Sequence, residues 1–225
     1  MNKLQHAIIM AAGRGIRMMP LTDVVPKAMV PFQGSTIIAN GIKRINQHIK
    51  HTYITVGYKG SILAEHVIDM GVDAVFNTSG KGNSWWLYNT LIKHIDEPVV
   101  VLTCDNVIEL DFDKLLEEYD KFNQPACMII PVKPIPGLEG DYIFHHNNVV
   151  KKIDRHKASD SYCSGIQVVN PFQINQHTKN VEDFNDVWEQ LIEQGQVYSS
   201  NIYPERWFAV DTVEQLNKLN NSLKF

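Results

Sequence analysis

Short apolar runs alternate with amphipathic segments along the first 122 residues, and this order restricts the folds that the chain can adopt. Consecutive apolar positions are typical of strands buried on both faces, whereas apolar residues at helical spacing indicate helices with one buried side. The predicted strands are residues 7–12, 52–56, 73–76 and 98–104, and the predicted helices are 35–49, with Ser35 as its cap, 61–69, 85–95 and 111–122. A repeated strand–helix order predicts a parallel sheet with right-handed crossovers.

The pattern changes after Pro125. Strands are predicted at residues 127–132, 142–145, 149–153, 165–169 and 208–210, an extended segment at 197–203, and helices at 184–194 and 213–223. Asn147 and Asn148 are suited to a hairpin turn. Residues 131–140, with three prolines and two glycines, are predicted to form a mobile loop. The second part of the chain is therefore expected to extend the sheet with mixed strand directions.

Bulk properties exclude several classes of protein. The 225 residues carry a net charge of −4, with a pI near 6.1 and no long basic run, which argues against nucleic acid or an anionic membrane as a partner. We find neither an apolar stretch of ~20 residues nor a signal-peptide pattern. Cys104, Cys127 and Cys163 are far apart and odd in number, so we expect reduced core thiols in a cytoplasmic protein. The open helix faces and short strands permit a homodimer but do not require one, so we expect a monomer or a homodimer.

The first predicted strand opens into a glycine-rich basic loop. Gly13 and Gly15 allow backbone N–H groups to approach an anion, and Arg14 and Arg17 can neutralise it. Glycines and scattered charges also occur in ordinary surface turns, which is the alternative. The spacing is neither that of a P-loop nor that of the dinucleotide-binding G-x-G-x-x-G motif, since Met18 stands at the third glycine position.

Residues 13–31 read G-x-G-x-R-M-x-P-L-T-x-x-x-P-K-x-M-x-P. This string resembles the signature of the sugar-1-phosphate nucleotidylyltransferases, including their phosphocholine cytidylyltransferase-like members. The resemblance implies a nucleotide-diphospho-sugar transferase-like (Rossmann-like) α/β/α fold with a central mixed, mainly parallel sheet. It also implies transfer of a nucleoside monophosphate from an NTP to a phosphorylated small molecule, with release of pyrophosphate. We expect a single domain over residues 1–225, with a nucleotide-binding half at about 1–124 and an acceptor-binding half at about 125–225.

The resemblance assigns catalytic roles to two cations. Arg17 is expected to hold the β- and γ-phosphates, for which its planar fork is suited, and Lys27 to neutralise the α-phosphate and the acceptor phosphate. A solvated loop lysine is the alternative for Lys27. The expected nucleotide-binding residues are Ala11, Ala12, Gly13, Arg14, Gly15, Gly82, Asn83 and Ser84.

Two aspartates resemble the family's Mg²⁺ ligands. Asp105 follows the predicted strand at 98–104, and ligands of α/β sheets bind at the carboxyl ends of strands. Asp211 stands in WFAVDT, which is similar to the family's W-x-x-V-D-T. Two carboxylates suffice for Mg²⁺ when phosphate oxygens and water complete the shell. Asp105 could instead be a turn residue, and Asp211 could cap the last helix with Glu214, or do both jobs.

The acceptor site resembles the family least. Residues 80–84 depart from the E-T-G or G-T-A pattern of many sugar enzymes. Residues 83–87, Asn-Ser-Trp-Trp-Leu, are closer to the N-x-x-S-L of cytidylyltransferases, although the serine is displaced. This resemblance favours CTP and a phosphocholine-like or other non-sugar phosphate or phosphonate. Trp85, Trp86, Arg155 and Trp207 are the candidate acceptor-binding residues. Core packing for the Trp pair, and solvent exposure for Arg155 or the similarly placed Lys152, are the alternatives.

Three other functions stay open from the sequence. The first is a sugar-1-phosphate uridylyl- or guanylyltransferase that makes an NDP-sugar. The second is a glycosyltransferase that uses an NDP-sugar, although it would not need Arg17 and Lys27 for a leaving pyrophosphate. The third is a regulatory nucleotide-binding subunit, which would be expected to lack one of Arg17, Lys27, Asp105 or Asp211, all of which are present. The favoured enzyme would activate a small molecule for cell-surface polysaccharide or lipid biosynthesis.

Overall fold

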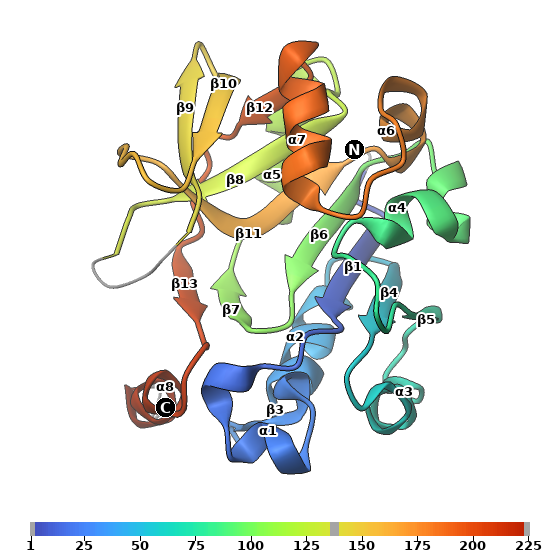
Figure 1. The fold of residues 1–225 in the computed structure, drawn as a ribbon, viewed down its shortest axis with the longest axis vertical. Helices are drawn as coiled ribbons and strands as arrows, with labels where there is room; N and C mark the ends of the chain where they lie inside the picture. Colours follow the sequence, from blue (N-terminus) through green and yellow to red (C-terminus); the bar gives the residue numbers. More distant parts are fainter. Residues whose placement is uncertain (1–2, 136–139, 223–225) are drawn as a thin grey trace.

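A nine-stranded mixed sheet runs through the computed structural model, which describes residues 3–135 and 140–222 (Figure 1). The strand order is β5-β4-β1-β6-β11-β8-β12-β10-β9. The strands are β1 His6–Ala11, β4 His51–Val56, β5 Ala74–Asn77, β6 Val99–Thr103, β8 Cys127–Val132, β9 Tyr142–His146, β10 Val149–Asp154, β11 Tyr162–Val169 and β12 Val197–Ser199.

The first four strands of this order, β5, β4, β1 and β6, are parallel. Successive crossovers lead from β1 outward to β4 and β5, and the chain then returns to place β6 on the other side of β1. The strand order therefore reverses between β1 and β6. In open α/β sheets, ligands bind at such a switch point, outside the carboxyl ends of the strands.

The second part of the chain extends the same sheet. β11 is antiparallel to both β6 and β8, β8 and β12 are parallel, and the β9–β10 hairpin closes the far edge. Asn147 and Asn148 both have positive φ, as the predicted hairpin turn requires. The predicted mixed, mainly parallel α/β fold is confirmed.

Helices cover both faces of the sheet. Buried residues of α2 Ile37–Ile45, α3 Gly60–Val67 and α5 Phe112–Lys121 pack on one face, and those of α4 Trp85–Asn89, α6 Pro171–His177 and α7 Phe184–Glu193 pack on the other. Within β1, Ala7, Ile9 and Ala11 join the first core and Ile8 the second, because alternate side chains of a strand point to opposite faces. None of the helices in the described residues is long and apolar enough to cross a bilayer.

Two predicted helices differ most from the structure, since the one predicted at 35–49 ends at Ile45 and the one predicted at 85–95 is broken. The helix predicted at 35–49 starts at Ile37, since Thr36, not Ser35, is the cap, and its hydroxyl accepts a hydrogen bond from the Ala39 N–H. Ser35 lies in β3 Ser35–Thr36, which pairs with β2 Pro31–Phe32. The helix predicted at 85–95 is two pieces, α4 and the 3₁₀ helix η3 Leu91–His94, separated at the extended residue Thr90.

The sequence patterns did not predict the short turns within residues 16–29, the strands β2 and β3, the helix α6, or β7 Asn106–Glu109. β7 forms a separate ribbon with β13 Arg206–Ala209, which overlaps the strand predicted at 208–210. The extended segment predicted at 197–203 is a strand only in β12. Of the mobile loop predicted at 131–140, residues 136–139 lie outside the described residues.

Candidate active site

The glycine-rich loop follows β1 at the switch point and consists of three short turns, η1 Ile16–Met18, α1 Leu21–Val24 and η2 Lys27–Met29. The buried Thr22 hydroxyl donates to the Gly15 carbonyl at 2.9 Å and so folds the loop back on itself. Gly15 has φ +66°, and a Cβ there would lie 2.8 Å from the Lys27 Cβ. Only glycine allows Lys27 to pass this close to the loop.

Lys27 is the centre of a cluster of four charges. Its ammonium lies 2.5 Å from Asp105 Oδ2 and 2.8 Å from Asp211 Oδ1, and Arg17 Nη2 lies 2.9 Å from the same Asp211 oxygen. Only 10% of the Lys27 side chain is exposed. Burial by itself would lower its pKa, but the two carboxylates outweigh this effect and raise the pKa above the ordinary lysine value. Lys27 is therefore charged at neutral pH.

The ribbon of β7 and β13 brings the two aspartates together. Asp105 directly precedes β7, and Asp211 comes two residues after the end of β13. The strands pair antiparallel with Ala209 opposite Asn106, and the Val210 N–H donates to the Asp105 carbonyl at 3.0 Å. Residues far apart in the chain are thus placed on either side of the Lys27 ammonium.

The cap of the last helix, α8 Val213–Ser222, is not Asp211. The Thr212 hydroxyl accepts from the Gln215 N–H at 3.2 Å, while Gln215 Oε1 accepts from the N–H groups of Asp211 and Thr212. This is a capping box shifted by one residue from the predicted pair of Asp211 and Glu214. The Asp211 carboxylate is consequently available to Lys27 and Arg17.

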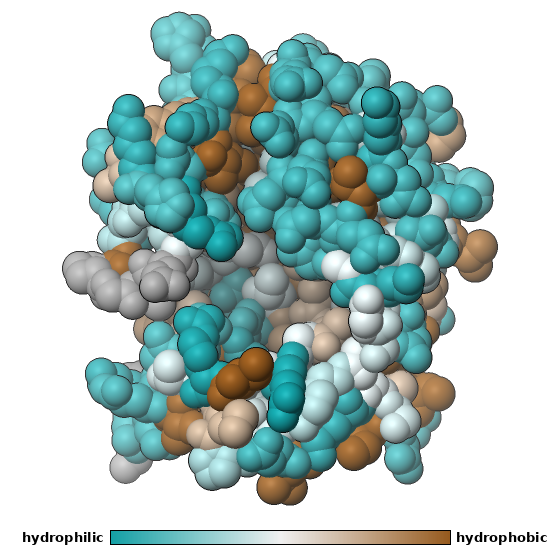
Figure 2. Space-filling model, viewed as in Figure 1, coloured by the Kyte–Doolittle hydropathy of each residue, from teal (hydrophilic) through white to brown (hydrophobic). Residues whose placement is uncertain are grey.

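A cavity of about 800 Å³ opens beside this charge cluster. Figure 2 shows a hollow across the middle of this face, between the part that carries α7 and the part that carries α1 and α8. Of the predicted site residues, the cavity lining includes Ala12, Gly13, Arg14, Gly15, Arg17, Lys27, Gly82, Asn83, Trp86, Asp105 and Asp211. The structure therefore brings both predicted cations and both predicted metal ligands to one cavity.

Five predicted site residues lie outside that lining: Ala11, Ser84, Trp85, Arg155 and Trp207. The Ala11 N–H donates to Thr55 Oγ1, and the buried Ser84 hydroxyl donates to the Val181 carbonyl. These two contacts hold the strand end and the start of α4 in place. The nucleotide-binding roles of both residues stay predictions.

The acceptor candidates among these five have protein partners. Arg155 Nε lies 3.1 Å from Asp141 Oδ1, and the Trp207 indole N–H donates to the Ser164 carbonyl at 2.9 Å. The Lys81 ammonium lies 5.7 Å from the centre of the Trp85 ring. By contrast, Trp86 is buried and lines the cavity, and its indole N–H has no hydrogen-bond partner among the described residues. The roles of these four residues toward an acceptor stay predictions.

Tyr58 and Thr78 also line the cavity, although the sequence patterns did not predict either residue. Tyr58 comes two residues after β4, and its ring lies 5.3 Å from the Arg14 guanidinium carbon. Thr78 directly follows β5. The rule that ligands bind at the carboxyl ends of parallel strands would have identified both positions.

The three cysteines are free thiols, as predicted. Cys104 lies next to Asp105, and burial, with the Asp105 charge as a smaller contribution, raises the pKa of its thiol to about 12. Such a thiol is protonated at neutral pH, so it lacks the thiolate that a nucleophile needs.

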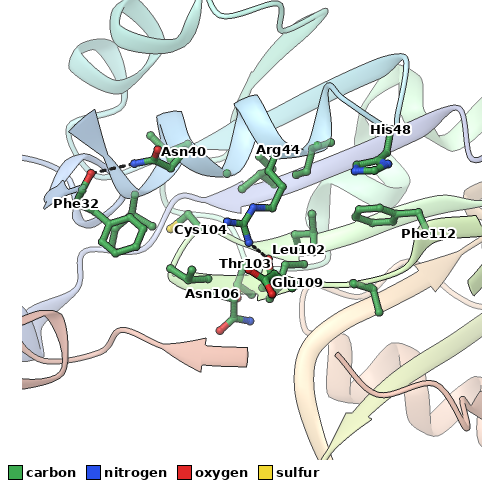
Figure 3. Close-up of a pocket in the computed structure, with 18 of the residues that line it drawn as sticks. Phe32, Asn40, Arg44, His48, Leu102, Thr103, Cys104, Asn106, Glu109 and Phe112 are labelled. Carbon is green, nitrogen blue, oxygen red and sulfur yellow. Dashed lines mark hydrogen bonds between the residues drawn. The ribbon is translucent and has the colours of Figure 1, made fainter. Parts of the chain in front are cut away.

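A second cavity, of about 330 Å³, lies between α2 and the β6–β7 segment (Figure 3). Two of its polar side chains have partners within the protein: Arg44 donates to the Ile108 carbonyl, and Asn40 donates to the Phe32 carbonyl at 2.9 Å. The His48 and Phe112 rings meet at its far end, with centroids 5.5 Å apart. The basic loop residues line the larger cavity and not this one, so the larger cavity is the candidate for binding phosphates.

Residues 6–137, more than half of the chain, match the nucleotidyl transferase family. The chain belongs to this family. The mannose-1-phosphate guanylyltransferase catalytic subunit beta of Drosophila melanogaster is 20% identical over 210 residues, which are 88% of this chain and 57% of that protein. The bifunctional protein GlmU of Methanococcus maripaludis is 35% identical over 106 residues, 47% of this chain and 23% of that protein. This chain therefore spans only part of the length of these two relatives.

Two solved structures share the fold over nearly their whole length. The CTP:phosphocholine cytidylyltransferase of Streptococcus pneumoniae superimposes with a TM-score of 0.76 at 21% identity, covering 99% of this chain and 100% of that one. The inositol-1-phosphate CTP transferase of T. maritima does so with a TM-score of 0.74 at 16% identity, covering 100% and 99%. At these identities the likeness shows the fold.

Proposed function

We propose that the protein is a Mg²⁺-dependent nucleotidyltransferase that moves a nucleoside monophosphate from an NTP to a phosphorylated small molecule. One observation carries this proposal: Lys27 and Arg17 converge with Asp105 and Asp211 at the mouth of the larger cavity. The cations suit a triphosphate, and the cluster lies at the switch point of the sheet. Membership of the nucleotidyl transferase family supports the same reaction.

In the proposed reaction, an oxygen of the acceptor phosphate forms a bond to the α-phosphorus of the NTP. The bond from that phosphorus to the bridging oxygen breaks, and pyrophosphate leaves. Such a transfer depends on positioning and on neutralisation of charge more than on covalent help from the protein. Arg17, with 66% of its side chain exposed, can turn to the leaving β- and γ-phosphates. The more buried Lys27 is suited to the α-phosphate.

The donor set fits a Mg²⁺ ion. Asp105 Oδ2 and Asp211 Oδ1 both approach the Lys27 ammonium, so their carboxylates face one cationic position. The described residues contain no group of three or more His, Cys, Asp or Glu that could hold a metal, so phosphate oxygens and water would have to complete the shell. When bound, the ion would neutralise phosphate charge. Asp105 and Asp211 would hold it, and Lys27 would have to yield its place between them.

We favour CTP as the donor and a phosphocholine-like or other non-sugar phosphate or phosphonate as the acceptor. Residues 83–87, Asn-Ser-Trp-Trp-Leu, support this choice by their likeness to the cytidylyltransferase pattern. The fold itself is shared by both substrate classes, because the two CTP-dependent enzymes named above and a putative glucose-1-phosphate thymidylyltransferase of Bacillus anthracis all match this chain over nearly its whole length. The competing possibility is a sugar-1-phosphate uridylyl- or guanylyltransferase, because the Drosophila relative is named for a sugar 1-phosphate.

The test is pyrophosphate release with Mg²⁺ for each of the four NTPs against phosphocholine, an aminoalkylphosphonate and a set of sugar 1-phosphates. We expect release with CTP and a non-sugar phosphate or phosphonate. Release only with a sugar 1-phosphate would support the competing substrate class and keep the reaction. Transfer of sugar from an NDP-sugar, with no pyrophosphate released in any combination, would refute the proposed reaction in favour of a glycosyltransferase.

A further inference from the structure

The ribbon that carries both aspartates does not belong to the nine-stranded sheet. β7 and β13 pair only with each other as strands, within the part of the chain that the structure describes. Two-stranded ribbons are marginally stable by themselves. The positions of Asp105 and Asp211 therefore depend on what attaches this ribbon to the rest of the protein.

One backbone carbonyl anchors both strands of the ribbon. The Ser164 carbonyl of β11 accepts from Asn106 Nδ2 on β7 at 2.7 Å and from the Trp207 indole N–H on β13 at 2.9 Å. Ser164 is itself held firmly, since it is only 2% exposed and its hydroxyl donates to the Ile130 carbonyl of β8 at 2.6 Å. The anchor thus lies on the central sheet.

The backbone at this point is shaped for a close approach. The register of β11 against β8 shifts between Cys163 and Ile166, and Gly165 has φ +81°. A Cβ on Gly165 would lie 2.9 Å from Asn106 Nδ2 and 3.2 Å from Thr103 Oγ1. Irregularities of this kind re-aim groups beside active sites, and here glycine leaves room for the ribbon.

We propose that Trp207 and Asn106 are positioning residues, which tie the ribbon to the Ser164 carbonyl and so hold Asp105 and Asp211 in place for one divalent cation. This inference rests on the proposed function and gives Trp207 a role different from contact with the acceptor. Each of these two side chains donates one hydrogen bond to the Ser164 carbonyl, which lies beside β7 and β13. Their loss is expected to weaken cation binding while leaving the acceptor site intact.

The experiment compares Trp207→Phe with Trp188→Phe. The control is matched, since the Trp188 indole N–H also donates at 2.9 Å to a residue of β11, Gln167, but lies in the core away from the aspartates. Mn²⁺ affinity is measured by electron paramagnetic resonance with CTP present and no acceptor. NTP and acceptor KM values and the melting temperature are measured beside it.

For Trp207→Phe we expect Mn²⁺ affinity to fall about two- to tenfold, the effect of one lost hydrogen bond, with an unchanged acceptor KM. Trp188→Phe should lower the melting temperature comparably and leave Mn²⁺ affinity unchanged. Asn106→Ala, which removes the second donor, should repeat the Mn²⁺ effect and provides a second test if Trp207→Phe does not fold.

Two results would overturn the proposal. If Trp207→Phe raises the acceptor KM and leaves Mn²⁺ affinity unchanged, Trp207 contacts the acceptor instead. If Trp207→Phe and Trp188→Phe lower Mn²⁺ affinity equally, the effect comes from a general loss of structural order. Failure of the proposed function is distinguishable, because it appears in the wild-type protein as an absence of pyrophosphate release. A wild-type protein that binds no Mn²⁺ with any NTP would overturn both.

Discussion

At the scale of single residues, Lys27 is the unusual feature of this protein. A buried ammonium is tolerated only when its charge is compensated, and here two carboxylates contact it. The same ammonium keeps those carboxylates from repelling each other. Lys27 therefore competes with any cation for Asp105 and Asp211, and we expect metal to bind together with the triphosphate that draws Lys27 away.

Replacing Lys27 with Met removes the charged ammonium and keeps an unbranched side chain that is one atom shorter. We expect turnover to fall at least about 100-fold, as when a group that stabilises the transition state is removed. Mn²⁺ affinity of the NTP-free protein should rise at least about tenfold, because charges 4 Å apart interact by about 4 kcal/mol at an effective dielectric of 20. Titration followed by electron paramagnetic resonance measures the affinity.

Lys114→Met is the matched control, since Lys114 pairs with Asp111 at 3.0 Å on the exposed surface. It should change neither turnover nor Mn²⁺ affinity. Unchanged Mn²⁺ affinity in Lys27→Met would show that Lys27 does not compete with the metal.

At the scale of elements, the glycine-rich loop depends on one close contact, between Gly15 and Lys27. Gly15 and Gly34 both have positive φ, but a Cβ on Gly34 would meet no atom within 4 Å, whereas one on Gly15 would meet the Lys27 side chain. Alanine substitutions at the two positions therefore distinguish the effect of backbone strain alone from the added effect of displacing Lys27.

We predict that Gly34→Ala lowers the free energy of unfolding by about 1 kcal/mol and leaves kcat/KM unchanged, since it adds only left-handed strain. Gly15→Ala should lower stability at least as much and also reduce kcat/KM at least about tenfold, the effect of about 1.4 kcal/mol in the transition state. Denaturant unfolding and steady-state kinetics measure the two effects. Equal kcat/KM in both variants would contradict a role for this contact in catalysis.

At the scale of the whole molecule, the glycine-rich loop near the start of the sequence packs against α8 near its end. Leu216 and Leu219 of α8 form a buried cluster with Met18 and Val30 of the N-terminal loop and with Val210, the neighbour of Asp211. Figure 1 shows α8 beside the segment that carries α1. Packing of the last helix therefore supports both the glycine-rich loop and Asp211, the proposed metal ligand.

Leu216→Ala tests this support against Leu191→Ala, a fully buried leucine of α7 in the core on the other side of the sheet. Both should lower the free energy of unfolding by about 2–5 kcal/mol. Only Leu216→Ala should weaken NTP binding, measured by calorimetry well below the melting temperature. If Leu216→Ala and Leu191→Ala lose NTP affinity equally, the loss results from reduced global stability and not from the contact of α8 with the loop.

How far the sequence leads can be judged from these same residues. Hydrophobic periodicity, glycine and proline preferences, and a contiguous signature act over a few neighbouring positions, so they were sufficient to predict the alternating strands and helices and the loop with Arg17 and Lys27. Asp105 was predicted because it ends an apolar strand. Interactions between neighbouring positions determine these features. The structure then brings Arg17, Lys27, Asp105 and Asp211 together.

Only the tertiary structure decided how those residues meet. The pairing of β7 with β13, the contact of Trp207 with the Ser164 carbonyl, and the cluster of α8 against the loop all join segments far apart in the chain. The cap of α8 is Thr212, one residue after the predicted Asp211, and Asp211 instead contacts Lys27 and Arg17. Local patterns carry no information about such pairings, because their free energy arises only when the folded chain brings the partners into contact.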